Sequence, residues 1–209
     1  MWPGKMDQGD SRGNAKDLQR IRTFLDEGNP HAADSLIVEA FSYKGIVRSH
    51  QTMGDLYLRF HRNRTITNYR RELSLDKALV TVSYLVGKYK FTERVFSSAV
   101  DDVLVIELTT DDPGGISCDA LLSRPEDYGR ATVHVSNPAP NEISMFCRVT
   151  QYGGRIHSVA VPMDYGIQFE TRLRAAIDRG TVTSEEGQLH IRGGQKVYLY
   201  IAGNTAFYH

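Results

Sequence analysis

Hydrophobic residues near the start of the chain recur at the three- and four-residue spacing of a helix. The first stripe consists of Leu18, Ile21 and Leu25, and the second of Ala33, Leu36, Ile37, Ala40 and Phe41. Asn14 stands where an N-cap belongs, and Gly28 where a helix commonly ends in the left-handed region. Asn29, followed by proline, fits the start of the next helix. The pattern predicts two short helices, about 15–27 and 30–42, whose apolar stripes must pack on another surface.

From residue 53 onward the hydrophobic period changes to two, which is the spacing of a half-buried strand. The alternating segments predict strands at about 56–60, 69–75, 80–86, 89–98, 103–110, 116–123, 130–136, 142–151, 181–183, 188–192 and 196–201. Gly87 and Lys88 have the length of a hairpin turn, and residues 111–115 and 137–141 are clusters of turn residues. Residues 166–179 fit a helix or a strand by period, and their flanks favour the strand.

These elements predict a mainly β chain, an antiparallel β-sandwich with a short N-terminal helical pair. Residues 1–13 are expected to be an extended lead-in, and residues 14–209 one domain that includes both helices. A chain of 209 residues with 41% hydrophobic content is sufficient for a packed core. Its apolar runs are far shorter than the roughly 20 residues that cross a bilayer, so no membrane partner is expected. No secretory signal is recognisable at the start, and the location of the protein is left open.

Charge argues against a polyanion as the partner. The 25 Lys and Arg balance the 25 Asp and Glu, so no overall field would hold nucleic acid or an anionic membrane. Within residues 56–71, however, there are six basic side chains, namely Arg59, His61, Arg62, Arg64, Arg70 and Arg71. With Tyr57, Phe60 and Tyr69 this segment could bind single-stranded nucleic acid. Arginines that alternate with apolar residues are more typical of the wet face of a strand, and we expect no nucleic-acid partner.

No compact catalytic or metal-binding motif is present. The chain lacks G-x-S-x-G, H-E-x-x-H, the P-loop and G-x-G-x-x-G patterns, and no two of its seven histidines are spaced at i, i+4. We therefore assign no catalytic residue, no metal and no cofactor. Adjacent carboxylates occur in turn-like sequence, at Asp101–Asp102, Asp111–Asp112, Glu126–Asp127 and Glu185–Glu186. Glycoside hydrolysis needs two carboxyl groups that face one cleft, and these pairs are interpreted as solvated loop acids.

Two residue types leave alternatives open. Cys118 and Cys147 lie in alternating apolar sequence and are interpreted as buried thiols in strands, a bridge between them being the alternative. The 11 tyrosines and 8 phenylalanines are compatible with a sugar-binding surface, because aromatic rings stack on the C–H faces of pyranoses. In a sandwich, however, most aromatic residues belong to the core.

Three segments read in order carry a family resemblance: Leu25–Gly28 before a small-residue helix, Gln51–Leu58, and Tyr69–Asp76 with its Tyr-Arg-Arg-Glu-Leu-x-Leu-Asp block. They resemble the N-terminal domain of glycoside hydrolase family 95, which contains α-L-fucosidases and α-L-galactosidases. The likeness covers nearly the whole chain. Thr52 stands where the family commonly has proline, and the family's opening strands with their Gly-Asn-Gly-Arg-x-Gly pattern are absent. The chain is therefore expected to be cut before those strands and before the catalytic barrel.

The resemblance implies a noncatalytic β-supersandwich that packs on an (α/α)6 barrel of the same polypeptide. In the family, inverting hydrolysis by a Glu acid and an Asn–Asp pair takes place in that barrel. The resemblance therefore implies that carbohydrate is a partner of this chain only as the substrate of the whole enzyme. Ser49, His50 and Gln51 are the loop expected nearest the rim of the substrate pocket, the alternative being an ordinary polar loop before a strand. Missing strands would expose sheet edges, which makes a homodimer a further expectation. A freestanding carbohydrate-binding module is the alternative function.

Overall fold

The computed structural model describes residues 13–41, 51–62, 64–126, 132–151, 155–156, 159–160 and 164–206. For residues 150, 151, 155, 156, 159, 160 and 164–166 it describes the backbone alone. The chain forms two compact units, a helical one within residues 2–50 and a strand-rich one within residues 51–209. The expectation of one domain over 14–209 that includes the helices stays a prediction.

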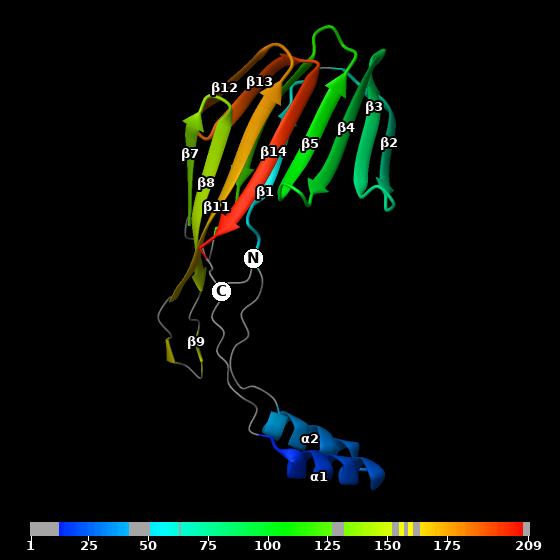
Figure 1. Cartoon of the computed structure of the whole chain (residues 1–209), viewed down its shortest axis with the longest axis vertical. Helices are drawn as coiled ribbons and strands as arrows, with labels where there is room; N and C mark the ends of the chain where they lie inside the picture. Colours follow the sequence, from blue (N-terminus) through cyan, green and yellow to red (C-terminus); the bar gives the residue numbers. More distant parts are fainter. Residues whose placement is uncertain are drawn as a thin grey trace. The chain divides into compact units, whose positions relative to one another are not determined.

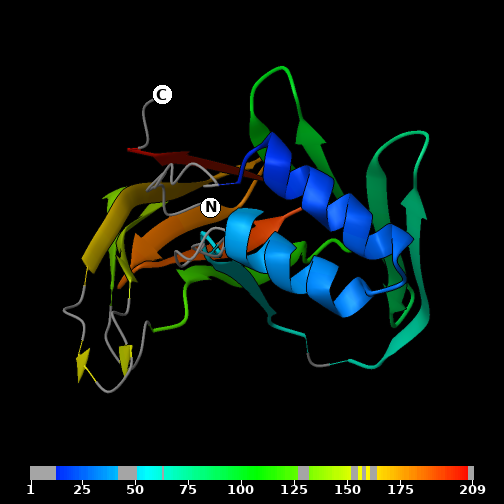
Figure 2. The same ribbon diagram turned by 90° about the horizontal axis from the view of Figure 1, so that it is seen from below.

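The helical unit begins and ends its helices with local caps. Helix α1 (Ala15–Asp26) has the predicted N-cap, since the side chain of Asn14 accepts from the backbone of Asp17 and the Asp17 carboxylate accepts from the Asn14 amide. This reciprocal pair satisfies amides that have no partner within the helix. Gly28 has φ +71°, as predicted for the end of α1. Helix α2 (Pro30–Phe41) follows at once, and the two helices lie side by side (Figures 1 and 2).

Few side chains are buried within this helical unit. Ile21 of α1 and Ala33 of α2 are 5% and 1% exposed. A Cβ at Gly13 would lie 2.5 Å from the ring of Phe41, so the residue before the N-cap of α1 packs against the last residue of α2. Isolated helices of this length are only marginally stable in water. Their apolar stripes are therefore expected to pack on a further surface. That expectation stays a prediction.

The strand-rich unit is an antiparallel β-sandwich, as predicted. The larger sheet has the order β2-β3-β4-β5-β14-β11-β8-β7, which Figure 1 shows from right to left, and the smaller sheet has the order β1-β6-β13-β12. The larger sheet consists of β2 (Ile66–Ser74), β3 (Leu79–Val86), β4 (Tyr89–Ser98), β5 (Val103–Thr110), β14 (Lys196–Thr205), β11 (Asp164–Ile177), β8 (Glu142–Gln151) and β7 (Val133–Ala139). The smaller sheet consists of β1 (Asp55–Phe60), β6 (Ile116–Ser123), β13 (Gln188–Gly194) and β12 (Thr181–Glu185). A separate two-stranded ribbon consists of β9 (Arg155–Ile156) and β10 (Val159–Ala160).

Strand boundaries confirm one ambiguous prediction and correct another. The segment that fitted either period is strand β11, and Gly87 turns the β3–β4 hairpin with φ +62°. The predicted turn over 137–141 is partly wrong, because β7 continues to Ala139. Pro138 is tolerated there because β7 lies at the edge of its sheet and the pairing register shifts beside it, so the missing N–H removes no regular ladder bond.

The core lies between the two sheets and consists of the inward positions of both. Leu173 and Ile143 of the larger sheet and Ile191 of the smaller sheet are fully buried. Cys118 and Cys147 are also fully buried and are free thiols, which confirms the prediction of two buried thiols in strands. Burial, together with the neighbouring Asp119 charge, raises the pKa of the Cys118 thiol to about 12, so this thiol stays protonated and unreactive.

Neither helix in the described part of the chain is long and apolar enough to cross a membrane.

Candidate functional site

The predicted rim loop is described in part. Ser49 and His50 lie outside the described residues, whereas Gln51 is described and is held by Arg124 just after β6. The Arg124 guanidinium donates to Oε1 of Gln51 at 2.7 Å, to the carbonyl of Thr52 at 3.2 Å and to Oγ1 of Thr132 at 3.0 Å. Because Arg124 is only 9% exposed, these bonds fix the segment that enters β1.

The segment before β1 lies against two strands of the larger sheet, β11 and β14. Thr171 Oγ1 of β11 donates to the carbonyl of Met53 at 3.4 Å. A Cβ at Gly203 in β14 would lie 2.5 Å from Cε of Met53, so the side chain of Met53 packs closely against the backbone of β14. The loop before β1 and the end of β14 therefore meet at one end of the sandwich.

A polar cluster stands on the outer face of the smaller sheet, centred on Asp119 of β6. Oδ2 of Asp119 lies 2.8 Å from Nε2 of His61, and Oδ1 lies 2.8 Å from Nδ1 of His190 and 2.7 Å from Nη2 of Arg192. An ionised carboxylate only accepts hydrogen bonds, so all three partners donate. Asp119 is only 7% exposed although its strand neighbours Cys118 and Ala120 face the opposite way, into the core.

The pKa of Asp119 reflects two opposing effects. Burial raises the pKa, but the hydrogen bonds from His190, Arg192 and His61 outweigh burial and hold the pKa well below the ordinary aspartate value. At neutral pH the carboxylate is therefore an ionised anchor for three side chains. Strand register brings it into this position, because Asp119 lies opposite His190 on β13 and opposite Arg59 on β1.

A hollow of about 430 Å³ lies on the same sheet, and its lining residue Arg59 is the β1 partner of Asp119 in the strand pairing. It is lined by Tyr57, Leu58, Arg59, Leu121 and Ser123 of strands β1 and β6. Tyr57 is 54% exposed and lies directly opposite Leu121 in the strand pairing. The hollow thus combines an exposed aromatic ring with an apolar side chain, a guanidinium and a hydroxyl.

The basic segment identified in the sequence is divided among different surfaces. Arg59 borders the hollow on β1, whereas the guanidinium of Arg62 lies 3.9 Å from the centre of the Phe60 ring and also bonds the Tyr84 hydroxyl. Tyr84 in turn donates to Glu93 at 2.7 Å, and burial followed by this bond raises the pKa of Tyr84 above its usual value. A second hollow, of about 280 Å³, lies beside Arg62. The arginines therefore do not form one stripe.

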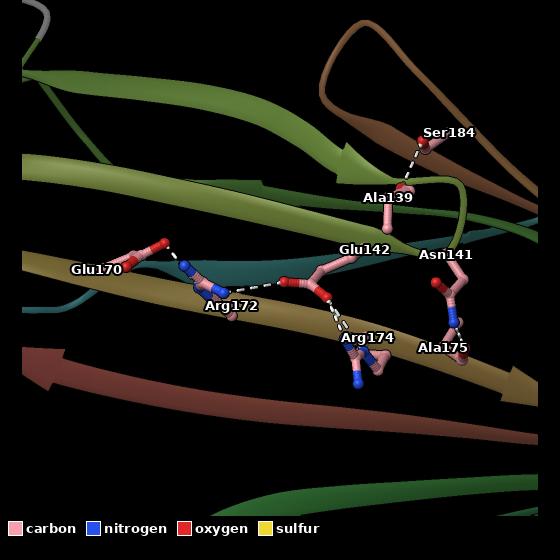
Figure 3. A network of polar contacts seen from close by, with 8 residues as sticks. All are labelled: Ala139, Asn141, Glu142, Glu170, Arg172, Arg174, Ala175 and Ser184. Carbon is pink, nitrogen blue, oxygen red and sulfur yellow. Dashed lines mark hydrogen bonds and ion pairs between the residues drawn. The ribbon is translucent and has the colours of Figure 1, made fainter.

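A second polar network crosses the outer face of the larger sheet, where Arg172 lies between two glutamates (Figure 3). Glu142 accepts from Arg174 at 2.7 and 3.1 Å and from Arg172 at 3.4 Å, while Glu170 accepts from Arg172 at 2.8 Å and from Ser144 at 2.6 Å. The Ser144 bond, followed by Arg172, lowers the pKa of Glu170. A carboxylate held ionised in the way that Glu170 is makes a poor general acid.

The described residues contain no group of three or more His, Cys, Asp and Glu side chains placed to hold a metal ion. In the Asp119 cluster the two histidines donate to the carboxylate instead of sharing an ion with it. Sequence reasoning did not single out Asp119, His190 or Arg192. Alternation places each on an outward face, but their proximity depends on which strands pair.

Comparison with known proteins identifies a family that covers the whole chain and a relative that covers most of it. The family model described as "Glycosyl hydrolase family 65, N-terminal domain" matches residues 1–209. The protein "Alpha-L-fucosidase 2" of Arabidopsis thaliana is 30% identical over 203 residues, which are 91% of this chain and 23% of that protein. A solved structure described as a kojibiose phosphorylase from the human microbiome matches 71% of this chain and 22% of its own, with 10% identity and a TM-score of 0.40, which is too low to carry an argument. This chain spans less than a quarter of the length of either protein.

Proposed function

The chain belongs to the family described as glycosyl hydrolase family 65, N-terminal domain, and on that premise we propose that it is the noncatalytic N-terminal β-sandwich of an α-L-fucosidase-like glycoside hydrolase. The observation that carries the proposal is the match to "Alpha-L-fucosidase 2", which is 30% identical over a span that is 23% of that protein. The greater part of such an enzyme lies outside the matched span and has room for the hydrolytic site. The resemblance to glycoside hydrolase family 95 supports the same substrate class.

The described carboxylates support a noncatalytic role. Glycoside hydrolysis uses one protonated and one ionised carboxyl group across a shared cleft. Asp119 and Glu170 each accept hydrogen bonds from arginine, and these bonds lower the pKa of both carboxyl groups, which opposes proton donation. Asp101, Asp102, Asp111 and Asp112 lie in turns or loops, as the sequence predicted.

We place the contact with a catalytic (α/α)6 barrel of the same polypeptide at the end of the sandwich where the loop before β1 meets β14. Arg124 fixes Gln51 there, and Ser49, His50 and Gln51 would contribute to the rim of the substrate pocket. The inverting chemistry, with a Glu acid and an Asn–Asp pair that activates water, belongs to the barrel. This chain would then shape and stabilise a pocket whose reacting groups lie elsewhere.

Hydrolysis of 4-nitrophenyl α-L-fucoside tests the proposal. We expect no turnover by residues 1–209 alone and measurable turnover by a longer form of the polypeptide that includes the barrel, with the β-anomer of fucose as the first product. Hydrolysis by the short chain would contradict the noncatalytic role. Absence of hydrolysis by the longer form would favour a freestanding carbohydrate-binding module.

The rim assignment has its own test in the longer form. Gln51→Ala should raise KM and leave kcat nearly unchanged if the loop contacts only bound substrate. Lys77→Ala, in the turn between β2 and β3, is the control and should change neither constant. Unchanged KM in Gln51→Ala would remove Gln51 from the rim.

A further inference from the structure

We propose that the outer face of the four-stranded sheet carries a binding site for a neutral pyranose sugar, centred on Tyr57 of β1. The site goes beyond the proposed function, because it gives this chain a ligand of its own, separate from any hydrolytic pocket. Three features lie on this face: a hollow, an exposed aromatic ring in its lining, and a set of polar side chains fixed by the buried carboxylate of Asp119, whose partner in the strand pairing is the lining residue Arg59.

The hollow has the size and lining of a small-ligand site. Its volume of about 430 Å³ lies within the roughly 300–1,000 Å³ that such sites occupy. The ring of Tyr57 is more than half exposed, and an aromatic ring offers an apolar face with a polar hydroxyl at its tip. Leu121 lies directly opposite Tyr57 in the strand pairing and adds apolar surface. A pyranose matches this lining, since it has an apolar C–H face surrounded by hydroxyl groups.

Hydrogen-bonding groups on the same face of the sheet as the hollow are held in place before any ligand arrives. Asp119 binds His61 through Nε2 and His190 through Nδ1. This leaves Nδ1 of His61 and Nε2 of His190, which have no hydrogen-bond partner among the described residues. The second nitrogen of each ring can accept from a sugar hydroxyl when the imidazole is neutral and donate to one when it is protonated. Fixing these rings in advance lowers the entropic cost of binding.

The charges around the site favour an uncharged ligand. Asp119 is neutralised by Arg192 at 2.7 Å. Arg59, which borders the hollow, lies two residues along β1 from Tyr57, and Asp55 lies two residues the other way on the same face. Asp55 and Asp119 are thus matched by Arg59 and Arg192, and Glu185 stands on the edge strand β12 of the same face. A sugar with many hydroxyl groups and no charge gains hydrogen bonds here without an unbalanced ionic contact.

Amide NMR titration of residues 1–209 with methyl α-L-fucoside and with methyl α-D-glucoside tests this site. We expect saturable shifts in β1 and β6 for at least one sugar at millimolar concentrations. Tyr57→Ala should weaken binding about tenfold through the loss of stacking, whereas Tyr57→Phe should bind like the wild type. Tyr69→Ala, at another exposed tyrosine on β2, is the matched control. If Tyr57→Ala does not fold, Arg59→Ala takes its place and should also weaken binding.

The absence of saturable shifts with both sugars would overturn the site, and so would binding that is unchanged in Tyr57→Ala and Arg59→Ala. Tighter binding of sodium glucuronate than of either neutral sugar would overturn the assignment to an uncharged ligand. Because these titrations use the short chain and no hydrolysis, their failure leaves the proposed function intact. Conversely, sugar binding would persist even if the longer form failed to hydrolyse a fucoside.

Discussion

Nδ1 of His190 lies 2.8 Å from Oδ1 of Asp119, across the paired strands β13 and β6. The same carboxylate holds His61 and Arg192, so one buried acid organises three side chains from different parts of the chain. Such a carboxylate links the stability of the sandwich to pH, because its folded-state pKa lies below its unfolded value.

Replacement of this carboxylate should make stability less dependent on acid pH. The wild-type contribution of Asp119 is fully present above the unfolded aspartate pKa of about 3.9 and is lost as the pH falls toward the lower folded pKa. Asp119→Asn should therefore lower the urea unfolding free energy by about 1–3 kcal/mol near pH 7, and by less near pH 3. Asp76→Asn, in the exposed β2–β3 turn, is the control. An equal loss at both pH values would contradict the linkage.

Gly180 is predicted to be irreplaceable by alanine. It has φ +85°, and a Cβ there would overlap the carbonyl oxygen of Arg192, which is backbone and cannot rotate away. Gly87 has a similar φ of +62°, but a Cβ there meets only the Arg64 side chain, at 3.6 Å or more. Gly87→Ala should cost about 1–2 kcal/mol of left-handed strain, whereas Gly180→Ala should cost more or prevent folding. Thermal unfolding of the two variants makes the comparison, and equal melting temperatures would contradict it.

Only a guanidinium at position 124 is predicted to anchor the loop before β1. Lysine keeps the charge but cannot donate in several fixed directions at once to Gln51, Thr52 and Thr132. Arg124→Lys should lower the unfolding free energy by about 2 kcal/mol. Arg70→Lys, whose side chain is 75% exposed in its pair with Glu72, should change it by less than about 0.5 kcal/mol. Similar losses in the two variants would mean that Arg124 does not anchor the loop.

The core prediction compares two leucines. Leu173 is fully buried between the sheets, whereas Leu75 is 83% exposed in a turn. Leu173→Ala should lower the unfolding free energy by about 2–5 kcal/mol because it leaves a cavity, and Leu75→Ala by less than about 0.5 kcal/mol. Chemical denaturation measures both. A small effect at Leu173 would show that the two sheets are not packed as described.

Local sequence predicted those elements whose stability depends on near neighbours. The caps at Asn14 and Gly28 are contacts between residues at most a few positions apart, so spacing alone revealed them. Period-two alternation predicted most strands, including β11, because the side chains of a strand face opposite sides whichever strand lies beside it. Pro138 was misread as part of a turn because a sequence does not show that β7 is an edge strand.

The sequence by itself therefore determined the sandwich class, the helical pair, the buried thiols and the family resemblance. Only the tertiary structure decided which polar residues meet. His61 and His190 lie 58 and 71 positions from Asp119, and they come together because β1 and β13 pair with β6 on either side in one particular register. A shift of one residue in either pairing would turn the partner to the opposite face. The packing of the two sheets around one core sets that register, and no local sequence pattern predicts it.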